Sequence, residues 1–547
     1  MRNRKLAILM VIVMCLLAAC SNAGETNESK GSNGTNGQAK GGDKAAPTSP
    51  AKQADKKKIT VMVYDRSNVP QGEGSYEKNR WTEWINENVP KDVEVAFVPI
   101  PRGAVRDKLN SLFASDSAPD LILDYDPAIR NDLVIQNLVL PLDELIDQHS
   151  VYYKELIAKY PALVKLSTKE DGKNYMVGRL DGLDINHYVF VRQDWLTKLG
   201  LQVPTTPEEL LEVAVAFAER DPDDNGKKDT YGIALSGTSE NIITYMYQTI
   251  YPVLDSDLAY VNPWEQQKAA HALKKRLYEA GAVDRDFLTD TTGKKAEQDF
   301  LSGKLGIWGG NFDAGKLASL KEAVPTAVLT PMALPRTEFG QFAPELNSPM
   351  SPIGLINRNA KHPDAVIQFI DFISSPETGK TMYYGLEGVH WKAGENGCPQ
   401  IIDEEKYKQE VSWNRDYFML TSKYFDACLK QPSQNMTEVQ KEFADLTEAA
   451  RALYLQPSSP PPYAIDKNVV PTLPQDLFII KQNTENSIKD IWVKAIVTPG
   501  YTMEQALEEA QGMWNKSGGD KVDQYIAKWF SDNKSRLIPI SEWYTIQ

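Results

Sequence analysis

The most specific chemistry in the sequence lies in a run of acidic and amide side chains around a glycine, Asp221-Pro-Asp-Asp-Asn-Gly-Lys-Lys-Asp229. Oxygen donors stand at alternate positions, and the central glycine permits a sharp turn. Calcium is a hard cation that takes several oxygen ligands, so this spacing predicts a calcium loop. The expected ligands are the side chains of Asp221, Asp223, Asn225 and Asp229 and the main-chain carbonyl of Lys227.

The loop departs from an EF-hand at its twelfth position, where Gly232 replaces the bidentate glutamate. The sequence therefore predicts a calcium loop with a truncated ligand set and not an EF-hand sensor. The alternative interpretation is a polar turn without metal, because Asp and Asn form turns readily.

The elements that must position this loop precede it directly. Residues 189–191 are β-branched or aromatic and predict a strand, and a short helix is expected from Asp194 to Gly200. Thr206 and Pro207 open a longer helix, in which Glu209 is expected to complete a capping box. Its apolar residues share the spacing of a core-facing helix: Leu210, Val213, Ala214 and Phe217.

The amino terminus has the pattern of a secreted lipoprotein. A basic start is followed by an apolar run, residues 6–17, that is too short to span a bilayer. Leu17-Ala-Ala-Cys20 then resembles a bacterial lipobox, so residues 1–20 are expected to be a lipoprotein signal peptide. Acyl chains on Cys20 would anchor the protein to a membrane surface. The alternative is an ordinary cleavage site that happens to precede a cysteine.

Residues 21–57 are rich in Gly, Ser, Asn and Lys and are expected to form a flexible tether. About 490 residues remain after it, which is more than one hydrophobic core usually serves, so two or more lobes are expected. The formal net charge of −14 argues against a nucleic-acid partner. The lipid tether suggests a monomer.

The cysteines leave one question open. With Cys20 lipidated, Cys398 and Cys428 either pair in an oxidising location or remain two isolated thiols. The five histidines show no zinc-binding spacing.

The first part of the folded body alternates strands and helices. Strands are expected over residues 58–64, 93–98 and 121–124, with helices over 81–88 and 105–115. This alternation predicts a mostly parallel sheet, and ligands of such sheets bind at the carboxyl ends of the strands. The polar residues that follow the first and third strands are Asp65, Arg66, Asp124, Tyr125 and Asp126.

Several longer motifs resemble one family. They are Pro119-Asp-Leu-Ile-Leu, Asn137-Leu-Val-Leu-Pro-Leu-Asp-Glu-Leu-Ile146, residues 189–232, Phe300-Leu-Ser-Gly-Lys-Leu-Gly-Ile-Trp308, Pro331-Met-Ala-Leu-Pro335, Asn357-Arg-Asn-Ala-Lys-His-Pro-Asp364 and Tyr384-Gly-Leu-Glu-Gly-Val-His-Trp391. As a set, from about residue 58 to about residue 530, they resemble the family 1 type of extracellular solute-binding proteins of carbohydrate ABC importers. The resemblance is to the large lipoproteins of Gram-positive bacteria that are related to alginate-oligosaccharide-binding proteins.

The resemblance implies an α/β fold of the periplasmic-binding-protein-like type II, with two α/β lobes, an interlobe ligand cleft and a helix-rich C-terminal part. The first lobe would comprise residues 58–180 with 341–388, and the second residues 181–340 with 389–547. The chain would cross between lobes near residues 176–183, 335–352 and 384–391. The related proteins also have the calcium loop, with a further carboxylate where this sequence has Thr230. So far from the predicted cleft, the loop would be structural and hold the end of the Pro207 helix.

A sugar offers apolar faces to aromatic rings and hydroxyl groups to polar side chains, and the eleven tryptophans and 24 tyrosines are ample to line a long cleft. For each candidate, the alternative is a core or surface-loop residue. The candidate ligand-binding residues are Asp65, Arg66, Tyr125, Asp126, Arg179, Asp181, Trp264, Trp308, Asn311, Glu387, His390 and Trp391.

The expected function is that of a non-enzymatic receptor on the extracellular face of the cell membrane. It would close on an oligosaccharide and deliver it to the permease subunits of an ABC importer. A secreted glycoside hydrolase or lyase is the first alternative, although no motif isolates a catalytic pair among carboxylates such as Asp124, Asp126, Asp181 and Glu387. The second alternative keeps the fold with a peptide or organic acid as ligand, which would call for more cations than Arg66, Arg102 and Arg179.

Overall fold

The computed structural model describes residues 55–180, 183–250, 252–394, 397–422, 428, 436–461, 469–537 and 539–543. The chain divides into two units, residues 1–54 and residues 55–547. The predicted signal peptide with Cys20 and the predicted tether up to residue 54 lie outside the described residues.

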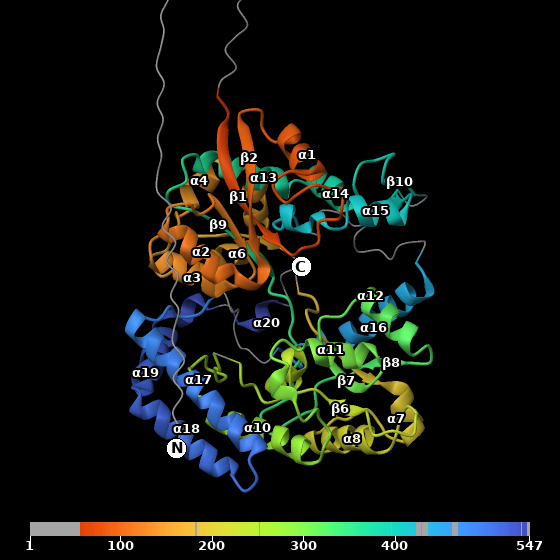
Figure 1. The fold of residues 1–547 in the computed structure, drawn as a ribbon. Coiled ribbons are helices and arrows are strands. Elements are labelled where there is room, and N and C mark those ends of the chain that lie inside the picture. Colours follow the sequence, from red (N-terminus) through yellow and green to blue (C-terminus); the bar gives the residue numbers. More distant parts are fainter. Residues whose placement is uncertain are drawn as a thin grey trace, which may run out of the picture. The chain divides into compact units, whose positions relative to one another are not determined.

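The first sheet has five strands in the order β2-β1-β3-β9-β4 (Figure 1). β1 pairs in parallel with both β2 and β3, whereas β9 runs antiparallel to β3 and to β4. The expected alternation of strands and helices over residues 58–124 is confirmed, and each strand carries buried β-branched or aromatic side chains. The bounds are β1 (Lys57–Asp65), α1 (Arg80–Asn88), β2 (Val93–Pro101), α2 (Val105–Ala114), β3 (Leu121–Asp124), β4 (Val177–Leu180) and β9 (Met350–Ile356).

The second sheet has four strands in the order β6-β7-β5-β8. β6 and β7 are parallel, and β5 runs antiparallel to both β7 and β8. Every residue of β5 and β7 is buried, which is typical of central strands that are covered on both faces. The bounds are β5 (Tyr188–Arg192), α7 (Gln193–Leu199), α8 (Pro207–Glu219), β6 (Tyr231–Ile233), β7 (Leu305–Gly310) and β8 (Leu329–Pro331).

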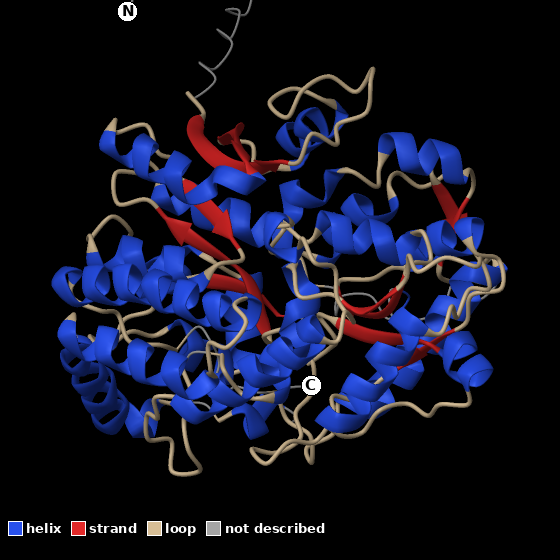
Figure 2. Cartoon of the chain, turned by 60° about the horizontal axis from the view of Figure 1, so that its bottom comes forward, coloured by secondary structure: helices blue, strands red, loops and turns tan. Residues whose placement is uncertain are grey.

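Helices make up most of the remaining described chain, as Figure 2 shows. After β3 come α3 (Pro127–Ile135), α4 (Asp143–His149), α5 (Tyr152–Lys159) and α6 (Ala162–Ser167). Around the second sheet lie α9 (Asn241–Met246), α10 (Trp264–Glu279), α11 (Lys294–Leu301) and α12 (Ala314–Ala323). After β9 come α13 (Pro363–Ser374), α14 (Pro376–Tyr384), the hairpin β10 (Trp391–Ala393) and β11 (Pro399–Ile401), and α15 (Glu404–Glu410).

The helix-rich C-terminal part consists of α16 (Glu438–Tyr454), α17 (Gln475–Val497), α18 (Met503–Lys516), α19 (Gly519–Asn533) and α20 (Ile540–Trp543). α17, α18 and α19 pack on one another around small apolar clusters of their own. None of the helices in the described residues is both long enough and apolar enough to cross a bilayer.

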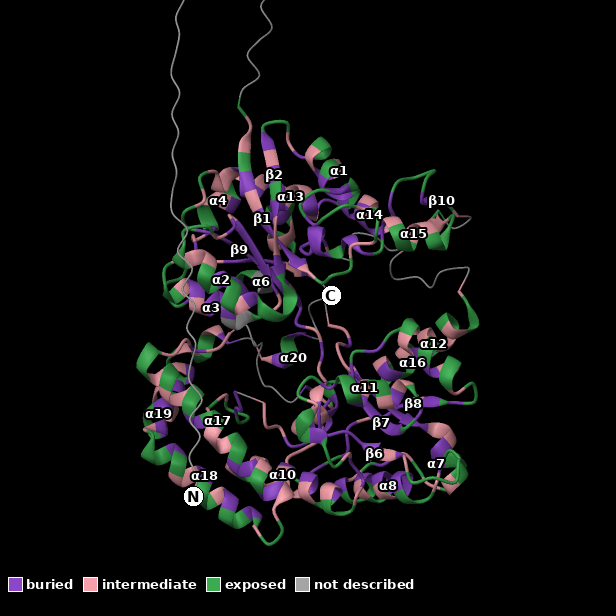
Figure 3. Ribbon diagram, viewed as in Figure 1, coloured by how far each residue is buried: buried purple, intermediate pink, exposed green. Residues whose placement is uncertain are grey.

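Each sheet has its own hydrophobic core (Figure 3). The packing differs from the expected domain boundaries at two segments that were placed in the second lobe. Residues 411–420 and 540–543 pack in the core of the first sheet. The physical reason is aromatic contact over long sequence distances: Tyr417 meets Phe97 edge to face at 4.9 Å, and Phe418 meets Tyr383 at 4.9 Å.

The connections between the two cores follow from these contacts. The chain leaves the first sheet after β4 and enters the second at β5, and it returns between β8 and β9. The third passage was expected near residues 384–391. It lies instead between Leu420, in the first core, and Leu446, in the core that contains β5 and β7.

The residues that begin and end the helices next to the second sheet mostly make the contacts that the sequence predicts. Gly200 ends α7 in the left-handed conformation at φ 68°, and the Thr206 side chain accepts from the Glu209 N–H at the start of α8. The Glu209 carboxylate accepts from the Thr205 N–H at 2.7 Å, one residue before the position that a capping box predicts.

The structure also settles the cysteine question. Cys398 and Cys428 form a disulfide that links the β10–β11 hairpin to a position 30 residues later.

Candidate functional site

The carboxyl ends of β1, β2 and β3 lie at the same edge of the first sheet, because the three strands are parallel. Asp65 and Arg66 stand at the end of β1, and Arg102 directly follows β2. Tyr125 and Asp126 follow β3. This edge therefore brings together four residues that the sequence predicted, at the place where open α/β sheets bind ligands.

Two tyrosines and two arginines form the centre of this edge. The rings of Tyr64 and Tyr125 stack at 6.1 Å with an interplanar angle of 15°. The Arg102 guanidinium lies 4.7 Å from the Tyr64 ring centre and 5.8 Å from that of Tyr125, and Arg66 lies 5.1 Å from Tyr64. Tyr64 is fully buried, Tyr125 is partly exposed and Arg102 is exposed, so Tyr125 and Arg102 are the members that face solvent.

Arg66 is held in place by Asp416, a residue 350 positions away. The Arg66 Nε and Nη2 atoms donate to the two Asp416 carboxylate oxygens at 2.7 and 3.0 Å. This fork fixes the guanidinium and, through its hydrogen bond to Asp416, raises the pKa of Arg66. Asp416 is itself positioned because the neighbouring Tyr417 hydroxyl accepts from Asn79 and donates to the Tyr76 carbonyl.

The acidic residues of the edge differ in their burial and in their partners. Asp124 is 1 % exposed, and burial raises its pKa, although the nearby Tyr64 hydroxyl and Arg102 charge oppose this. Asp126 is exposed and forms an ion pair with Arg106 at 3.4 Å. Asp65 caps the turn that follows it by accepting the Ser67 N–H.

Two predicted residues lie where the chain leaves this sheet. Arg179 on β4 donates to the Met419 carbonyl at 3.3 Å, so it and Arg66 contact the same segment, residues 416–419. Asp181 lies outside the described residues.

Trp308 was predicted to contact the ligand, but in the structure its side chain lies in the core. Trp308 is 3 % exposed and stacks on Phe300 of α11 at 5.5 Å. It packs in the core because β7 is a central strand with neighbours on both sides. Asn311, just beyond the same strand, is exposed.

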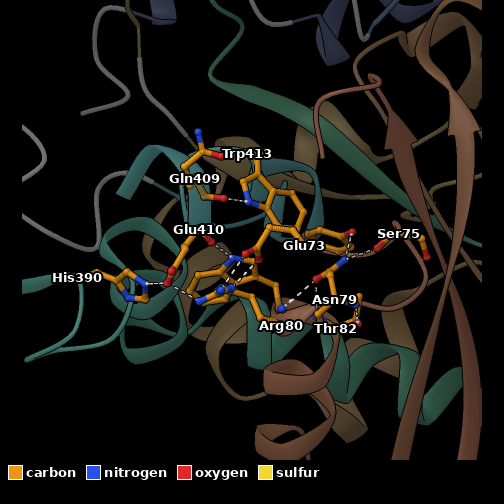
Figure 4. A network of polar contacts seen from close by, with 11 residues as sticks. Glu73, Ser75, Asn79, Arg80, Thr82, His390, Gln409, Glu410 and Trp413 are labelled. Atoms are coloured by element: carbon orange, nitrogen blue, oxygen red, sulfur yellow. Dashed lines mark hydrogen bonds and ion pairs between the residues drawn. The ribbon is translucent and has the colours of Figure 1, made fainter. Parts of the chain in front are cut away.

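His390 and Trp391 also differ from expectation, because both side chains are buried, at 1 % and 5 % exposed. Figure 4 shows His390 beside Glu410 in a network of polar contacts. The His390 Nδ1 accepts from the Leu386 N–H, and its Nε2 lies 2.9 Å from Glu410. Trp391 donates to the Gly385 carbonyl, so both side chains hold the segment that precedes β10, whereas Glu387 is exposed.

The network has an electrostatic consequence. Arg80 makes a two-bond fork to Glu73 and also pairs with Glu410. Burial raises the pKa of Glu410, but the hydrogen bond to His390 and the charge of Arg80 outweigh it and leave this pKa below its usual value.

We therefore expect Glu410→Gln to lower stability at neutral pH by about 1 kcal/mol, since the group is partly exposed. A carboxylate whose pKa is lowered on folding stabilises fully above the unfolded pKa, about 4.3, and loses this contribution as the pH falls through the folded value. The difference in melting temperature between wild type and Glu410→Gln should shrink below about pH 4. Glu405→Gln, exposed on the same helix, is the control. A difference that stays constant from pH 7 to pH 3 would contradict this account.

Trp264, the remaining predicted aromatic, lines a pocket of about 300 Å³. The pocket is formed by residues 249–271 and 481–526 and contains none of the residues of the sheet edge described above.

In the loop from Asp221 to Asp229 the predicted donor side chains lie close together, with Asp223 and Asn225 exposed and Asp221 and Asp229 partly exposed. The Asn225 Nδ2 donates to Asp223 at 2.8 Å and to Asp229 at 2.9 Å, and Asp221 accepts the N–H groups of Asn225 and Gly226. Burial and the neighbouring Asp221 raise the pKa of Asp223. Lys227 donates its N–H to the Asn225 Oδ1.

This donor set fits a hard cation in its chemistry but not in its present arrangement. Across the described ranges, no three acidic, histidine or cysteine side chains are grouped so that they could hold a metal ion. The amide nitrogen of Asn225 stands between two carboxylates, and a cation there would require the amide oxygen to turn toward them.

Three residues of the sheet edge were not among the predicted site residues. Tyr64 and Arg102 stand at the ends of expected strands, so the strand-end rule that selected Asp65 and Tyr125 also applies to them. Asp416 had no signal in the sequence, because it joins the site only through a contact between distant segments.

Comparison with known proteins places these observations in a family. The model of the bacterial extracellular solute-binding protein family matches residues 77–380, more than half of the chain. The polygalacturonan/rhamnogalacturonan-binding protein YtcQ of Bacillus subtilis (strain 168) is 25 % identical over 492 residues, which cover 84 % of this chain and 89 % of YtcQ. Lipoprotein LipO of the same organism is 21 % identical and covers 97 % of this chain and 99 % of its own.

A solved structure shows the same fold. The ABC-transporter substrate-binding protein FusA of S. pneumoniae, in complex with kestose, has a TM-score of 0.65 and 16 % identity and covers 88 % of this chain and 100 % of FusA. An EF-hand mutant of FusA in complex with fructo-nystose matches to the same extent. The fold is thus the two-lobed α/β fold of periplasmic binding proteins, and the chain belongs to the bacterial extracellular solute-binding protein family.

Proposed function

We propose that this protein is the substrate-binding component of an ABC importer and that its ligand is an oligosaccharide. The observation that carries the proposal is the group formed by Tyr125, Arg102 and the Arg66–Asp416 pair at the carboxyl edge of the first sheet. A partly exposed ring and fixed forks of donors and acceptors are the groups that recognise sugar faces and hydroxyls. The names of YtcQ and FusA, which bind saccharides, support the same ligand class.

The mechanism that we propose is closure of the two lobes on the ligand, after which a membrane permease recognises the closed form. A rigid binding surface favours this, because little ordering free energy is then lost on binding. The Asp416 fork and the tyrosine stack supply that rigidity at the edge of the first sheet.

We propose a binding role without catalysis. A glycosidase of the usual kind needs a pair of carboxylates that are free to act on opposite sides of one bond. At this edge Asp416 is engaged by Arg66, Asp126 is paired with Arg106 and Asp124 is buried, which suits fixed recognition better than proton transfer.

We further propose that the mature protein is a monomer on the outer face of a Gram-positive cell membrane, anchored by acyl chains on Cys20. The lipobox pattern supports the anchor, and LipO is named a lipoprotein.

The test is a titration of the folded body, residues 55–547, by isothermal calorimetry with uronic, neutral plant-wall and fructose oligosaccharides. We expect one class to bind and to be recovered unhydrolysed after overnight incubation. If the ligand is consumed while products accumulate, the protein is an enzyme and not a receptor. If peptides or organic acids bind and no saccharide does, the proposed ligand class is wrong, although the protein is still a binding protein of this fold.

We propose that the Asp221–Asp229 loop binds calcium structurally. The closeness of the Asp223, Asn225 and Asp229 side chains supports this, and one solved structure is of an EF-hand mutant of FusA. We expect calcium at a hundred times its Kd to stabilise the wild type by about 2.7 kcal/mol by mass action. Asp223→Ala should abolish this gain, whereas Asp224→Ala should keep it, because Asp224 pairs with Lys198 outside the donor set. If the wild type melts at the same temperature in calcium and in chelator, the loop is a polar turn that binds no calcium.

A further inference from the structure

The pocket beside Trp264 is separate from the edge of the first sheet. Its walls come from the segment that leads into α10, from α10 itself and from α17, α18 and α19. Its volume of about 300 Å³ lies at the lower end of the range for small-molecule sites, which suits one or two sugar rings.

Aromatic side chains form its walls, and their positions are fixed. Trp514 donates to Asp523 at 2.8 Å, and the Tyr260 hydroxyl donates to the same carboxylate at 3.1 Å. Trp492 is 2 % exposed and stacks on His271 at 4.7 Å with an interplanar angle of 9°. Walls that are already ordered lose little entropy when a flat ligand binds against them.

The polar groups of the pocket include hydrogen-bond acceptors. Burial lowers the pKa of His271 to about 3, so its imidazole is neutral at physiological pH. The Nδ1 lies 2.7 Å from the Gln267 carbonyl and must therefore donate to it, which leaves the Nε2 as an acceptor. Asn262 uses its amide nitrogen on Asp523, so its oxygen is the end that accepts.

The charged groups at the pocket differ in their partners, and the Asp523 carboxylate behind the wall accepts from Trp514, Tyr260 and Asn262. Lys481 is compensated by Glu485 at 2.7 Å. Lys489, two turns after Lys481 on α17, is exposed and forms no ion pair within the described part of the chain. Lys489 is therefore available to pair with a carboxylate of a ligand next to the aromatic walls.

We propose that this pocket is a second binding site, which takes a single sugar residue carrying a carboxylate, such as a uronic acid. The ring face packs against the aromatic walls, the hydroxyls donate to the acceptors, and the carboxylate pairs with Lys489. This proposal rests on the proposed function only in taking the ligand to be a saccharide, and it concerns different residues.

The test is calorimetry of the folded body with D-galacturonate and, as the neutral match, D-galactose. We expect Lys489→Ala to weaken D-galacturonate binding about tenfold and to leave D-galactose unchanged, because one charge-assisted contact is lost. Gln267→Trp, which fills the pocket, should abolish the binding of both. Lys494→Ala, on the same helix but outside the pocket, should bind as the wild type does.

The outcomes separate this proposal from the proposed function. Lys489 is exposed, so its replacement by alanine is compatible with folding, which thermal unfolding will verify. Wild-type affinity in Lys489→Ala and Gln267→Trp, with loss in Tyr125→Ala, would overturn the second site and retain the first. Oligosaccharide binding lost in the pocket variants alone would support the pocket and overturn the sheet edge. Failure of the wild type to bind either sugar would overturn the second site.

Discussion

Replacement of Trp308 by alanine is expected to lower the free energy of unfolding by about 3–5 kcal/mol, because it removes a large side chain from a packed core. Trp308 is 3 % exposed, stacks on Phe300 and lies on a strand with every residue buried. Deleting the indole leaves a cavity that β7 and α11 cannot close without breaking the sheet register with β5. Denaturant unfolding, followed separately for the two lobes, measures the loss, which should fall in the lobe of the second sheet.

The control for this prediction is Trp308→Phe, which keeps an aromatic ring against Phe300 and should lose clearly less stability. Where Trp308→Ala is still folded, its oligosaccharide affinity should remain within about threefold of wild type, since in this structure the ring contacts only the core. A variant with unchanged stability and no ligand binding would restore the sugar-contact role that the sequence suggested.

Replacement of Tyr125 by alanine is expected to weaken oligosaccharide binding about a hundredfold, or about 2.7 kcal/mol. The change removes the partly exposed ring and also the aromatic face over which Arg102 lies. Tyr64 remains in place beneath, because it is fully buried among β1 and its neighbours. Calorimetry with the oligosaccharide that binds the wild type gives the measurement.

Tyr125→Phe separates the ring from the hydroxyl and should keep affinity within about threefold if stacking dominates. The melting temperature of Tyr125→Ala should fall only slightly, since the side chain is partly exposed at the margin of the core. Wild-type affinity in Tyr125→Ala would move the oligosaccharide site away from the edge of the first sheet.

Together, the two predictions distinguish aromatic residues by their environment. Trp308 and Tyr125 both lie at or near the carboxyl ends of strands, β7 and β3. One is covered by α11, and the other is partly exposed beside an arginine. Sequence patterns place a residue on a strand, but they do not show which helix will cover it.

Elements that depend on local chemistry were predictable from the sequence. β1, β2 and β3 follow apolar runs, and α8 begins at a Thr-Pro cap. Such signals act within a few residues, which is why propensity and capping rules are sufficient for them.

The site residues whose positions depend only on the strands that they follow were predictable from the sequence. Asp65, Arg66, Tyr125 and Asp126 meet because parallel strands end at one edge. The burial of His390 and Trp391 was not predictable, because it depends on partners such as Glu410, which only the fold brings close.

The sequence by itself determined the alternation that builds the first sheet and the strand-end residues, whereas the lipoprotein start and the calcium role of the Asp221 loop stay predictions. Tertiary structure alone decided that Cys398 pairs with Cys428, that Asp416 fixes Arg66 across 350 residues, and that residues 411–420 belong to the first core. The physical reason is range: capping, periodicity and turn chemistry are encoded in neighbouring residues. Burial and ion pairing between distant segments are decided only when the whole chain has packed.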